Sequence, residues 1–251
     1  MKNEFSPASG GELNLLKKDV PVKDTSGYVQ QYREIAIALG FRNRVTPLFV
    51  QPLDKSFNRL IKRGMDILIS TLIIISLLSW LLPLIALMIK LNSKGPVFFL
   101  QKRNKRNGEL FTCIKFRSMY VNADADLLPA TEDDQRITPL GKFLRNHYLD
   151  ELPQFFNVLW GDMSVIGPRP HMVRDNLYFE KTVKNYAYRN KVKPGITGLA
   201  QVLGYVGWAE DQLKIEARVN MDLFYVRHWC TRLDWVILFR TIKKMVGFTV
   251  S

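Results

Sequence analysis

An uncharged stretch of 23 residues, Ile67 to Ile89, restricts the folds open to this chain more than any other feature. As a straight helix it would be about 35 Å long, and the hydrocarbon core of a bilayer is about 30 Å thick. A buried core helix of a soluble protein is the alternative, but 23 residues is too long for a domain of this size. The stretch therefore predicts a helix that inserts into a lipid bilayer.

Both flanks of this helix are basic, and basic flanks prefer the cytoplasmic side of a membrane. The flanking cations are Lys55, Arg59, Lys62 and Arg63 before the helix, and Lys90, Lys94, Lys102, Arg103, Lys105 and Arg106 after it. A helix that enters the membrane, bends and returns keeps both flanks in the cytoplasm. Pro83 supplies the bend, because proline removes a backbone donor and clashes with the preceding turn, and Ser79 can bond a freed backbone group. We prefer this re-entrant helix, with a kinked span as the alternative.

The chain carries 36 Lys and Arg against 23 Asp and Glu, and this formal net charge of +13 requires a negatively charged partner. Residues 90–117 contain eight basic residues and one acid, whereas residues 122–135 contain five acids and no base. A nucleic-acid binder would have a more uniform basic surface, so we expect no nucleic acid partner. The two cysteines, Cys113 and Cys230, have no metal-ligand spacing, which argues against a disulfide scaffold and a zinc site.

The chain divides into three regions: a polar N-terminal extension (1–55), the membrane helix with its flank (56–90) and a cytoplasmic domain (91–251). Two apolar runs around Asn107-Gly108 predict a β-hairpin. Helices are predicted over residues 153–160, 174–188, 209–229 and 233–246. The last of these combines aromatic and basic residues and fits a membrane interface, with a core helix as the alternative. The predicted fold is mainly α with a small β-hairpin, a re-entrant membrane helix and interfacial amphipathic helices.

Two motifs place charged side chains where chemistry is expected. Lys115 and Arg117 alternate on a predicted strand, and two cations on one face suit a diphosphate; a solvated basic edge is the alternative. Asp150 and Glu151 precede Pro153, which fits the first turn of a helix and pushes Leu152 out of the helical region. Adjacent carboxylates there suit a nucleophile and a Mg²⁺ ligand, while simple helix capping is the alternative.

Two further motifs are loops. In Gly167-Pro168-Arg169-Pro170 the two prolines stiffen the loop that presents Arg169, which suits a planar anion; a rigid turn with a solvated arginine is the alternative. Lys193 begins KPGITG, a weak phosphate-cradle signal. The three histidines, at 147, 171 and 228, show no metal spacing, and we expect no role for them.

Taken together, the ordered motifs KFRSM (115–119), RITPLGKFLR (136–145), LDELPQFFNVLWGDMSVIGPRP (149–170) and KPGITGLAQV (193–202) resemble the bacterial sugar transferases that prime glycan assembly on a lipid carrier. These are the monotopic polyprenyl-phosphate phosphoglycosyl transferases, and the resemblance covers about residues 59–246. It implies that 91–251 is the catalytic domain. The implied reaction transfers a sugar phosphate from a UDP-sugar to polyprenyl (undecaprenyl) phosphate and releases UMP, as the priming step of exopolysaccharide, capsule, O-antigen or related glycan synthesis.

The resemblance also implies residue roles. Asp150 attacks the β-phosphorus and forms an aspartyl-phosphosugar intermediate, while Glu151, with Asp150, holds Mg²⁺. Arg169 with Pro168 and Pro170 contacts the nucleotide, and the phosphates are neutralised by Lys115, Arg117 and Lys193. The implied location is the cytoplasmic face of a bacterial inner membrane, and a homo-oligomer is compatible with the sequence.

The sequence departs from the family pattern at two places. Larger members begin with several membrane spans and an extra domain, whereas here only residues 1–55 precede the helix, as in the minimal version. The Ser-Pro pair of some members is Leu82-Pro83 here, so only the proline of that kink is kept. Two other functions stay open: a non-catalytic membrane adaptor that binds anionic lipid, and a direct glycosyltransferase that releases UDP.

Overall fold

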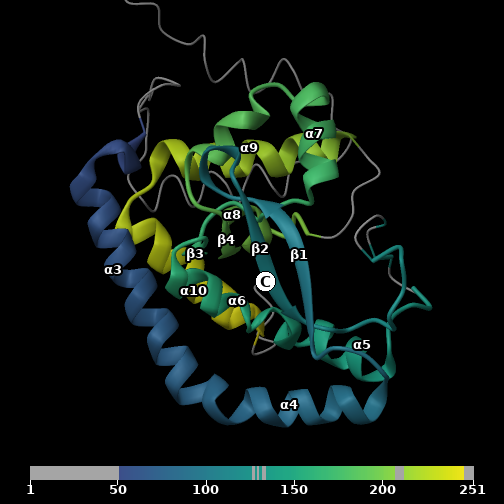
Figure 1. Cartoon of the computed structure of the whole chain (residues 1–251). Helices are drawn as coiled ribbons and strands as arrows, with labels where there is room; N and C mark the ends of the chain where they lie inside the picture. Colours follow the sequence, from purple (N-terminus) through teal and green to yellow (C-terminus); the bar gives the residue numbers. More distant parts are fainter. Residues whose placement is uncertain (1–50, 126–127, 129, 132–133, 207–211, 246–251) are drawn as a thin grey trace, which may run out of the picture.

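The computed structural model describes residues 51–125, 128, 130–131, 134–206 and 212–245 (Figure 1). The predicted extension 1–55 lies outside the described residues except for its last five positions. The main elements, in chain order, are α3 (Ser56–Ile73), α4 (Ser79–Asn92), β1 (Phe98–Asn104), β2 (Leu110–Phe116), α5 (Pro139–Asn146), α6 (Gln154–Trp160), β3 (Ser164–Ile166), α7 (Val173–Thr182), β4 (Gly195–Thr197), α8 (Leu199–Val202), α9 (Gln212–His228) and α10 (Thr231–Met245). The fold is mainly helical with a small antiparallel hairpin, as predicted.

The long apolar helix is bent. α3 and α4 run along the outside of the molecule and meet at a marked angle (Figure 1), and the π-helical segment Ile74–Leu78 joins them. π-Helical turns are a known cause of kinks. Pro83 lies inside α4, beyond the segment that joins the two helices, so proline alone does not account for the bend.

Serine hydroxyls satisfy backbone carbonyls around this bend. Ser76 Oγ donates to the carbonyl of Leu72 at 2.6 Å, and Ser79 Oγ donates to that of Ile75 at 2.7 Å. The Trp80 indole donates to the carbonyl of Ser76 at 2.9 Å. These bonds matter for a segment that enters lipid, because water cannot pair with an exposed carbonyl there.

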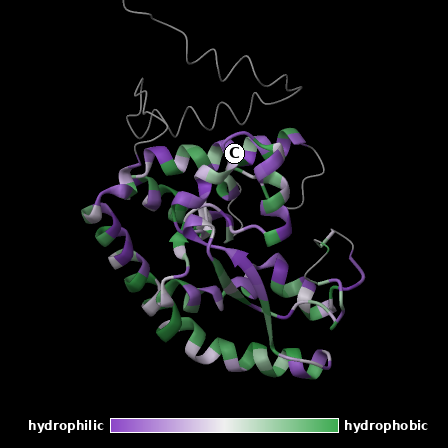
Figure 2. Ribbon diagram, turned by 45° about the horizontal axis from the view of Figure 1, so that its top comes forward, coloured by the Kyte–Doolittle hydropathy of each residue, from purple (hydrophilic) through white to green (hydrophobic). Residues whose placement is uncertain are grey.

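One face of the bent helix packs on the remaining fold. Leu78 of the π-helical segment and Ile85 and Ile89 of α4 are buried against a cluster that includes Phe116 and Leu144. The other faces of the bent helix carry exposed apolar side chains: Phe57, Leu60, Leu68, Leu72, Ile75, Trp80, Leu84, Leu87 and Leu91. Figure 2 shows this apolar character along α4. Among the described residues, Ser56–Asn92 is the one helix long and apolar enough to cross a membrane.

Buried polar contacts fix the start of α3 to the rest of the fold. Lys62 Nζ lies 2.9 Å from Asp234 Oδ2 in α10, and both side chains are buried. Asp66 Oδ1 accepts hydrogen bonds from Ser164 Oγ at 2.8 Å and from the Val165 amide at 2.9 Å, both in β3. One turn of α3 thus contacts β3, about 100 residues later in the chain, and α10, about 170 residues later.

The predicted hairpin is confirmed. β1 pairs with β2 antiparallel, from Phe98 opposite Phe116 to Asn104 opposite Leu110. Asn107 and Gly108 both have positive φ, 60° and 80°, as the turn signal requires. A second, parallel pair, β3 with β4, was not predicted, because three-residue strands leave no periodicity in the sequence.

The predicted helices hold, with changed ends. The helix predicted over 153–160 matches α6 closely. Within the described residues, the helices predicted over 209–229 and 233–246 match α9 and α10. The helix predicted over 174–188 stops at Thr182, and a 3-10 helix follows from Tyr186 to Lys191. Asn185 has a φ of 62°, a left-handed conformation that does not continue an α-helix. α10 exposes Trp235, Phe239 and Ile242, which recur at helical spacing and form an apolar face.

Candidate active site

The two adjacent acids occupy a short 3-10 turn, Leu149–Glu151, that leads into α6. Tyr148, just before the turn, has a φ of 56°, and both carboxylates are buried. Pro153 caps α6 as expected, but the prediction for Leu152 is wrong. That residue has helical angles (φ −55°, ψ −37°), because it continues the 3-10 turn directly into the α-helix.

Two cations hold Glu151. Lys115 Nζ lies 2.7 Å from Glu151 Oε1, and Arg169 contacts both carboxylate oxygens, with Nη1 to Oε2 at 3.0 Å. Burial alone would raise the pKa of Glu151, but the charges and hydrogen bonds of Arg169 and Lys115 outweigh it and hold that pKa well below its usual range. In turn, the charge of Glu151 raises the pKa of Arg169. Glu151 is therefore ionised and fixed in position.

Asp150 is held differently. Its carboxylate makes no hydrogen bond or ion pair with any residue that the structure describes, although it is only 7% exposed. Burial raises the pKa of Asp150, and the charge of Glu151 raises it further, while Lys115, Arg145 and Arg169 lower it. A buried carboxylate without fixed partners suits a nucleophile, because its lone pairs are available for reaction.

A cavity of about 520 Å³ opens beside Asp150. Its volume falls within the range of small-molecule sites. Six cationic side chains line it: Arg103, Lys115, Arg117, Arg145, Arg169 and Arg218. Cations beside a buried carboxylate can stabilise the charge that develops on a transferring phosphoryl group.

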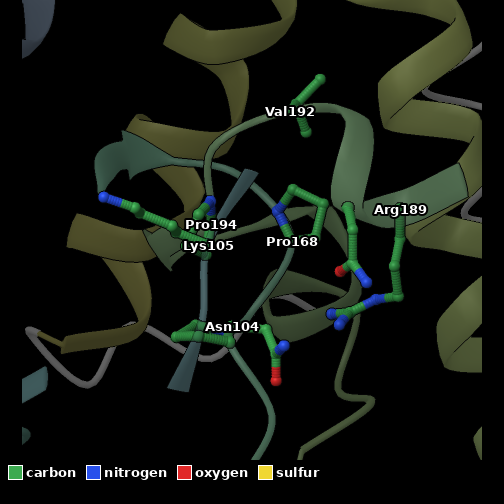
Figure 3. Close-up of a pocket in the computed structure, with 8 residues that line it drawn as sticks. Asn104, Lys105, Pro168, Arg189, Val192 and Pro194 are labelled. Carbon is green, nitrogen blue, oxygen red and sulfur yellow. The ribbon is translucent and has the colours of Figure 1, made fainter. Parts of the chain in front are cut away.

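The Gly167–Pro170 loop is rigid, as its prolines predict. The carbonyl of Pro168 accepts from the Gly195 amide at 3.0 Å, and the carbonyl of Arg169 accepts from Arg189 Nη2 at 2.6 Å. Arg189 is held in turn by Asp222, with its Nη2 2.8 Å from Oδ2. Figure 3 shows Pro168 and Arg189 beside a second cavity. That space is about 10 Å³, enough for about one water molecule.

The two remaining predicted phosphate ligands, Arg117 and Lys193, differ in their relation to this cavity. β2 ends at Phe116, so Arg117 does not share a strand face with Lys115. Its guanidinium lines the cavity but caps α4, donating to the carbonyls of Ser93 at 2.7 Å and Lys94 at 2.6 Å. Lys193 is not among the described residues that line the cavity and lies beside Gly161, close to Arg63. Burial and then the charge of Arg63 lower the pKa of Lys193.

Sequence reasoning missed several residues that line the cavity. Arg103 lies on β1, Arg145 at the end of α5, and His171 and Asp175 follow the Gly167–Pro170 loop. Arg103 donates to the carbonyl of Pro170, and Arg145 Nε donates to Ser118 Oγ at 2.7 Å. Arg145 ends the RITPLGKFLR motif and His171 directly follows the Gly167–Pro170 motif, but nothing in the sequence indicated that these residues lie beside Asp150.

The donor set at this site fits a magnesium ion that is shared with a phosphate. No group of three or more His, Cys, Asp or Glu among the described residues is arranged to hold a metal. Two adjacent carboxylates, Asp150 and Glu151, are nevertheless present, and Mg²⁺ is commonly bound by one or two carboxylates with substrate phosphates and water.

The family model described as "Bacterial sugar transferase" matches residues 57–247. The chain is 49% identical over 201 residues to UDP-glucose:undecaprenyl-phosphate glucose-1-phosphate transferase of Klebsiella pneumoniae, covering 80% of this chain and 43% of that one. It is 39% identical to a transferase of the same name from Caulobacter vibrioides, covering 78% and 73%.

The exopolysaccharide production protein PSS of Rhizobium leguminosarum is 40% identical, with 72% of this chain and 93% of that one covered. This chain therefore spans less than half of the Klebsiella relative and most of the Caulobacter and Rhizobium relatives. The match extends across the bent helix, the acidic turn and the Gly167–Pro170 loop. The chain belongs to the bacterial sugar transferase family.

Proposed function

We propose that this protein transfers a sugar phosphate from a UDP-sugar to undecaprenyl phosphate and releases UMP, as the priming step of exopolysaccharide or a related glycan. The observation that carries the proposal is the contrast between neighbouring acids: Asp150 is buried and makes no hydrogen bond or ion pair with the described residues, whereas Glu151 is fixed by Lys115 and Arg169. The names of the relatives supply the substrate classes, a UDP-sugar and undecaprenyl phosphate.

In the first step, a carboxylate oxygen of Asp150 attacks the β-phosphorus of the UDP-sugar. The bond between that phosphorus and the oxygen bridging to the α-phosphate breaks, and UMP leaves with the bridging oxygen. The product on the enzyme is an acyl phosphate, a mixed anhydride between the Asp150 carboxylate and the sugar phosphate. Lys115, Arg169 and Arg103 supply positive charge beside the transferring group.

In the second step, a phosphate oxygen of undecaprenyl phosphate attacks the same phosphorus and displaces the Asp150 carboxylate. The released product is undecaprenyl diphosphate sugar, and the enzyme returns to its first state. Asp150 and Glu151 would be the protein ligands of Mg²⁺, which when bound would neutralise charge on the diphosphate.

We further propose that the bent helix enters the cytoplasmic leaflet of a bacterial inner membrane and returns to the same side. Its exposed apolar faces require a nonpolar surrounding, and both of its ends are basic. The exposed apolar face of α10 would lie in the membrane interface. This arrangement lets a lipid phosphate and a soluble sugar nucleotide reach one cavity.

The nucleotide product distinguishes this reaction from the alternatives. Protein in nanodiscs is given Mg²⁺, undecaprenyl phosphate and a panel of UDP-sugars, and the released nucleotide is separated by chromatography. We expect UMP with at least one donor and none with Asp150→Asn, with the exposed His147→Asn as the control. UDP in place of UMP would indicate a direct glycosyltransferase, and no nucleotide with any donor would favour the adaptor.

A further inference from the structure

The cavity beside Asp150 contains two chemically different sets of polar groups. Its cations can serve the phosphates of a nucleotide sugar, because phosphate oxygens accept hydrogen bonds. Two lining residues, His171 and Asp175, instead follow the Gly167–Pro170 loop and offer acceptors. A phosphate cannot pair with an acceptor, so these two residues need a ligand group that donates a hydrogen bond.

A chain of hydrogen bonds fixes which nitrogen of His171 carries the proton. The chain begins at the carbonyl of Gly108, which can only accept, and the amide of Asn104 donates to it at 3.0 Å. The remaining oxygen of Asn104 accepts from the amide of Asn176, whose own oxygen accepts from the hydroxyl of Tyr186. Asn104 is labelled in Figure 3.

Tyr186 has therefore used its one proton and can only accept from His171 Nδ1, which lies 2.7 Å from the tyrosine oxygen. Burial, the largest cause, raises the pKa of Tyr186 to about 12, so the phenol keeps that proton. His171 is thus protonated on Nδ1, and its other nitrogen, Nε2, has a free lone pair.

His171 Nε2 has no partner in the part of the chain that the structure describes. The nitrogen is buried, and the residue is only 7% exposed while it lines the cavity. Burial and the neighbouring charges of Arg189, Arg218, Arg103 and Arg169 hold the pKa of His171 well below its usual range, so the ring stays neutral. A buried acceptor without a donor is costly, and a ligand donor would remove that cost.

Asp175 adds a second acceptor to the lining of the same cavity. It stands in the first turn of α7, is half-buried, and its carboxylate makes no hydrogen bond or ion pair with the described residues. Sugars carry several hydroxyl groups that can donate to such acceptors.

We propose that His171 Nε2 accepts a hydrogen bond from a hydroxyl group of the donor's sugar, and that this bond helps to select the sugar. The inference rests on the proposed function and adds a specificity residue to it. The sugar is favoured over the uracil because it is attached to the phosphorus that Asp150 attacks. His171 lies only two residues from Arg169, which holds the neighbouring Glu151.

Two substitutions separate the roles of the two nitrogens. His171→Asn keeps a donor near the position of Nδ1 and removes the acceptor at Nε2. His171→Gln keeps an acceptor near Nε2 and loses the bond to Tyr186. The matched control is His147→Asn, because His147 is exposed, bonds only the carbonyl of Phe143 among the described residues, and does not line the cavity.

The measurement is kcat/KM in nanodiscs for the UDP-sugar that the wild type uses best and for its monodeoxy analogues. We expect His171→Asn to lower kcat/KM about tenfold, the loss for one hydrogen bond, and His171→Gln to recover part of it. For the analogue that lacks the contacted hydroxyl, wild type and His171→Asn should be equal. Inhibition by UMP should be unchanged.

Several results would overturn the inference. One is a wild-type kcat/KM for a folded His171→Asn. Another is a loss of kcat/KM in His171→Asn that is equal for every deoxy analogue. A third is weaker inhibition by UMP, which would place the bond at the nucleotide. Thermal melting establishes whether the variant is folded, and His171→Phe, which also lacks an acceptor at this position, replaces an unfolded His171→Asn in the same comparison. Failure of the proposed function is separate, since the wild type itself would then release no UMP.

Discussion

At the scale of single residues, Asp150 and Glu151 are neighbours with opposite electrostatic roles. Glu151 is paired with two cations, and its charge stabilises the fold. The Asp150 carboxylate is buried and makes no hydrogen bond or ion pair in the part of the chain that the structure describes, so its ionisation costs stability, a cost that the proposed reaction would require. Substitutions at the two positions should therefore change thermal stability in opposite directions.

Asp150→Asn should raise the Tm at pH 7 by about 2–4 °C, the change that about 1 kcal/mol produces in a chain of this size. Glu151→Gln should lower it, by about 3 kcal/mol in the free energy of unfolding, because Lys115 and Arg169 lose their buried counter-ion. Melting curves of both variants in one detergent, compared with that of the control His147→Asn, test the direction of each change in Tm. A lower Tm for Asp150→Asn would contradict the account.

The pH dependence of the Glu151 contribution has a definite sign. The pKa of Glu151 is lower in the folded state, so its stabilisation is fully present above the unfolded pKa of about 4.3 and is lost as the pH falls toward the folded pKa. The Tm difference between wild type and Glu151→Gln should therefore shrink in acid.

The sequence indicated the two acids and Arg169 correctly as neighbours of one site, because their motifs are short and rigid. It could not place Arg103, Arg145 or His171, since these come from three separate elements. The ligand role of Arg117 stays a prediction, since in the structure that guanidinium lines the cavity and also donates to carbonyls at the end of α4. A basic residue that caps a helix and one that binds a ligand look alike in sequence, and only their neighbours in the fold distinguish them.

At the scale of elements, the bent helix joins the rest of the fold by buried polar contacts as well as by apolar packing. Lys62 and Asp234 connect α3 with α10, and Asp234 also accepts from Tyr225 at 2.8 Å and Trp229 at 2.9 Å. Removal of Lys62 leaves the Asp234 carboxylate buried without its cation, which is expensive.

Lys62→Met should lower the free energy of unfolding by about 3 kcal/mol. The double variant Lys62→Met with Asp234→Asn should recover part of that loss, because the Asp234 charge is removed together with its cation, while the buried Asp66 still loses the nearby charge of Lys62. Lys55→Met, an exposed position just before α3, is the control. Equal melting of Lys62→Met and Lys55→Met would show that this ion pair does not hold the helix.

The long apolar helix could be predicted from its length and lack of charge, and Pro83 pointed to a bend. The position of the bend could not be predicted, because it lies at the π-helical segment Ile74–Leu78, which has no sequence signal. Likewise, β3 and β4 are too short to leave a pattern.

At the scale of the whole molecule, the fold combines an apolar bent helix, a cationic cavity and a buried acid, and the proposed re-entrant helix would keep all three on one side of a membrane. If the helix is re-entrant, cysteines introduced at positions 55 and 93 should both react with a thiol reagent from the cytoplasmic side in inverted vesicles. Both should be protected in intact cells from a reagent that cannot cross the membrane. Labelling from opposite sides would establish a kinked span.

The central claim is that Asp150 carries the sugar phosphate between the two substrates. Its most direct test is the intact mass of the protein after incubation with Mg²⁺ and a panel of UDP-sugars, without undecaprenyl phosphate. The account predicts a gain of one sugar phosphate, absent in Asp150→Asn, and loss of that gain when undecaprenyl phosphate is added. An unchanged mass with a donor that nevertheless yields lipid-linked product, or an adduct that persists in Asp150→Asn, would contradict it.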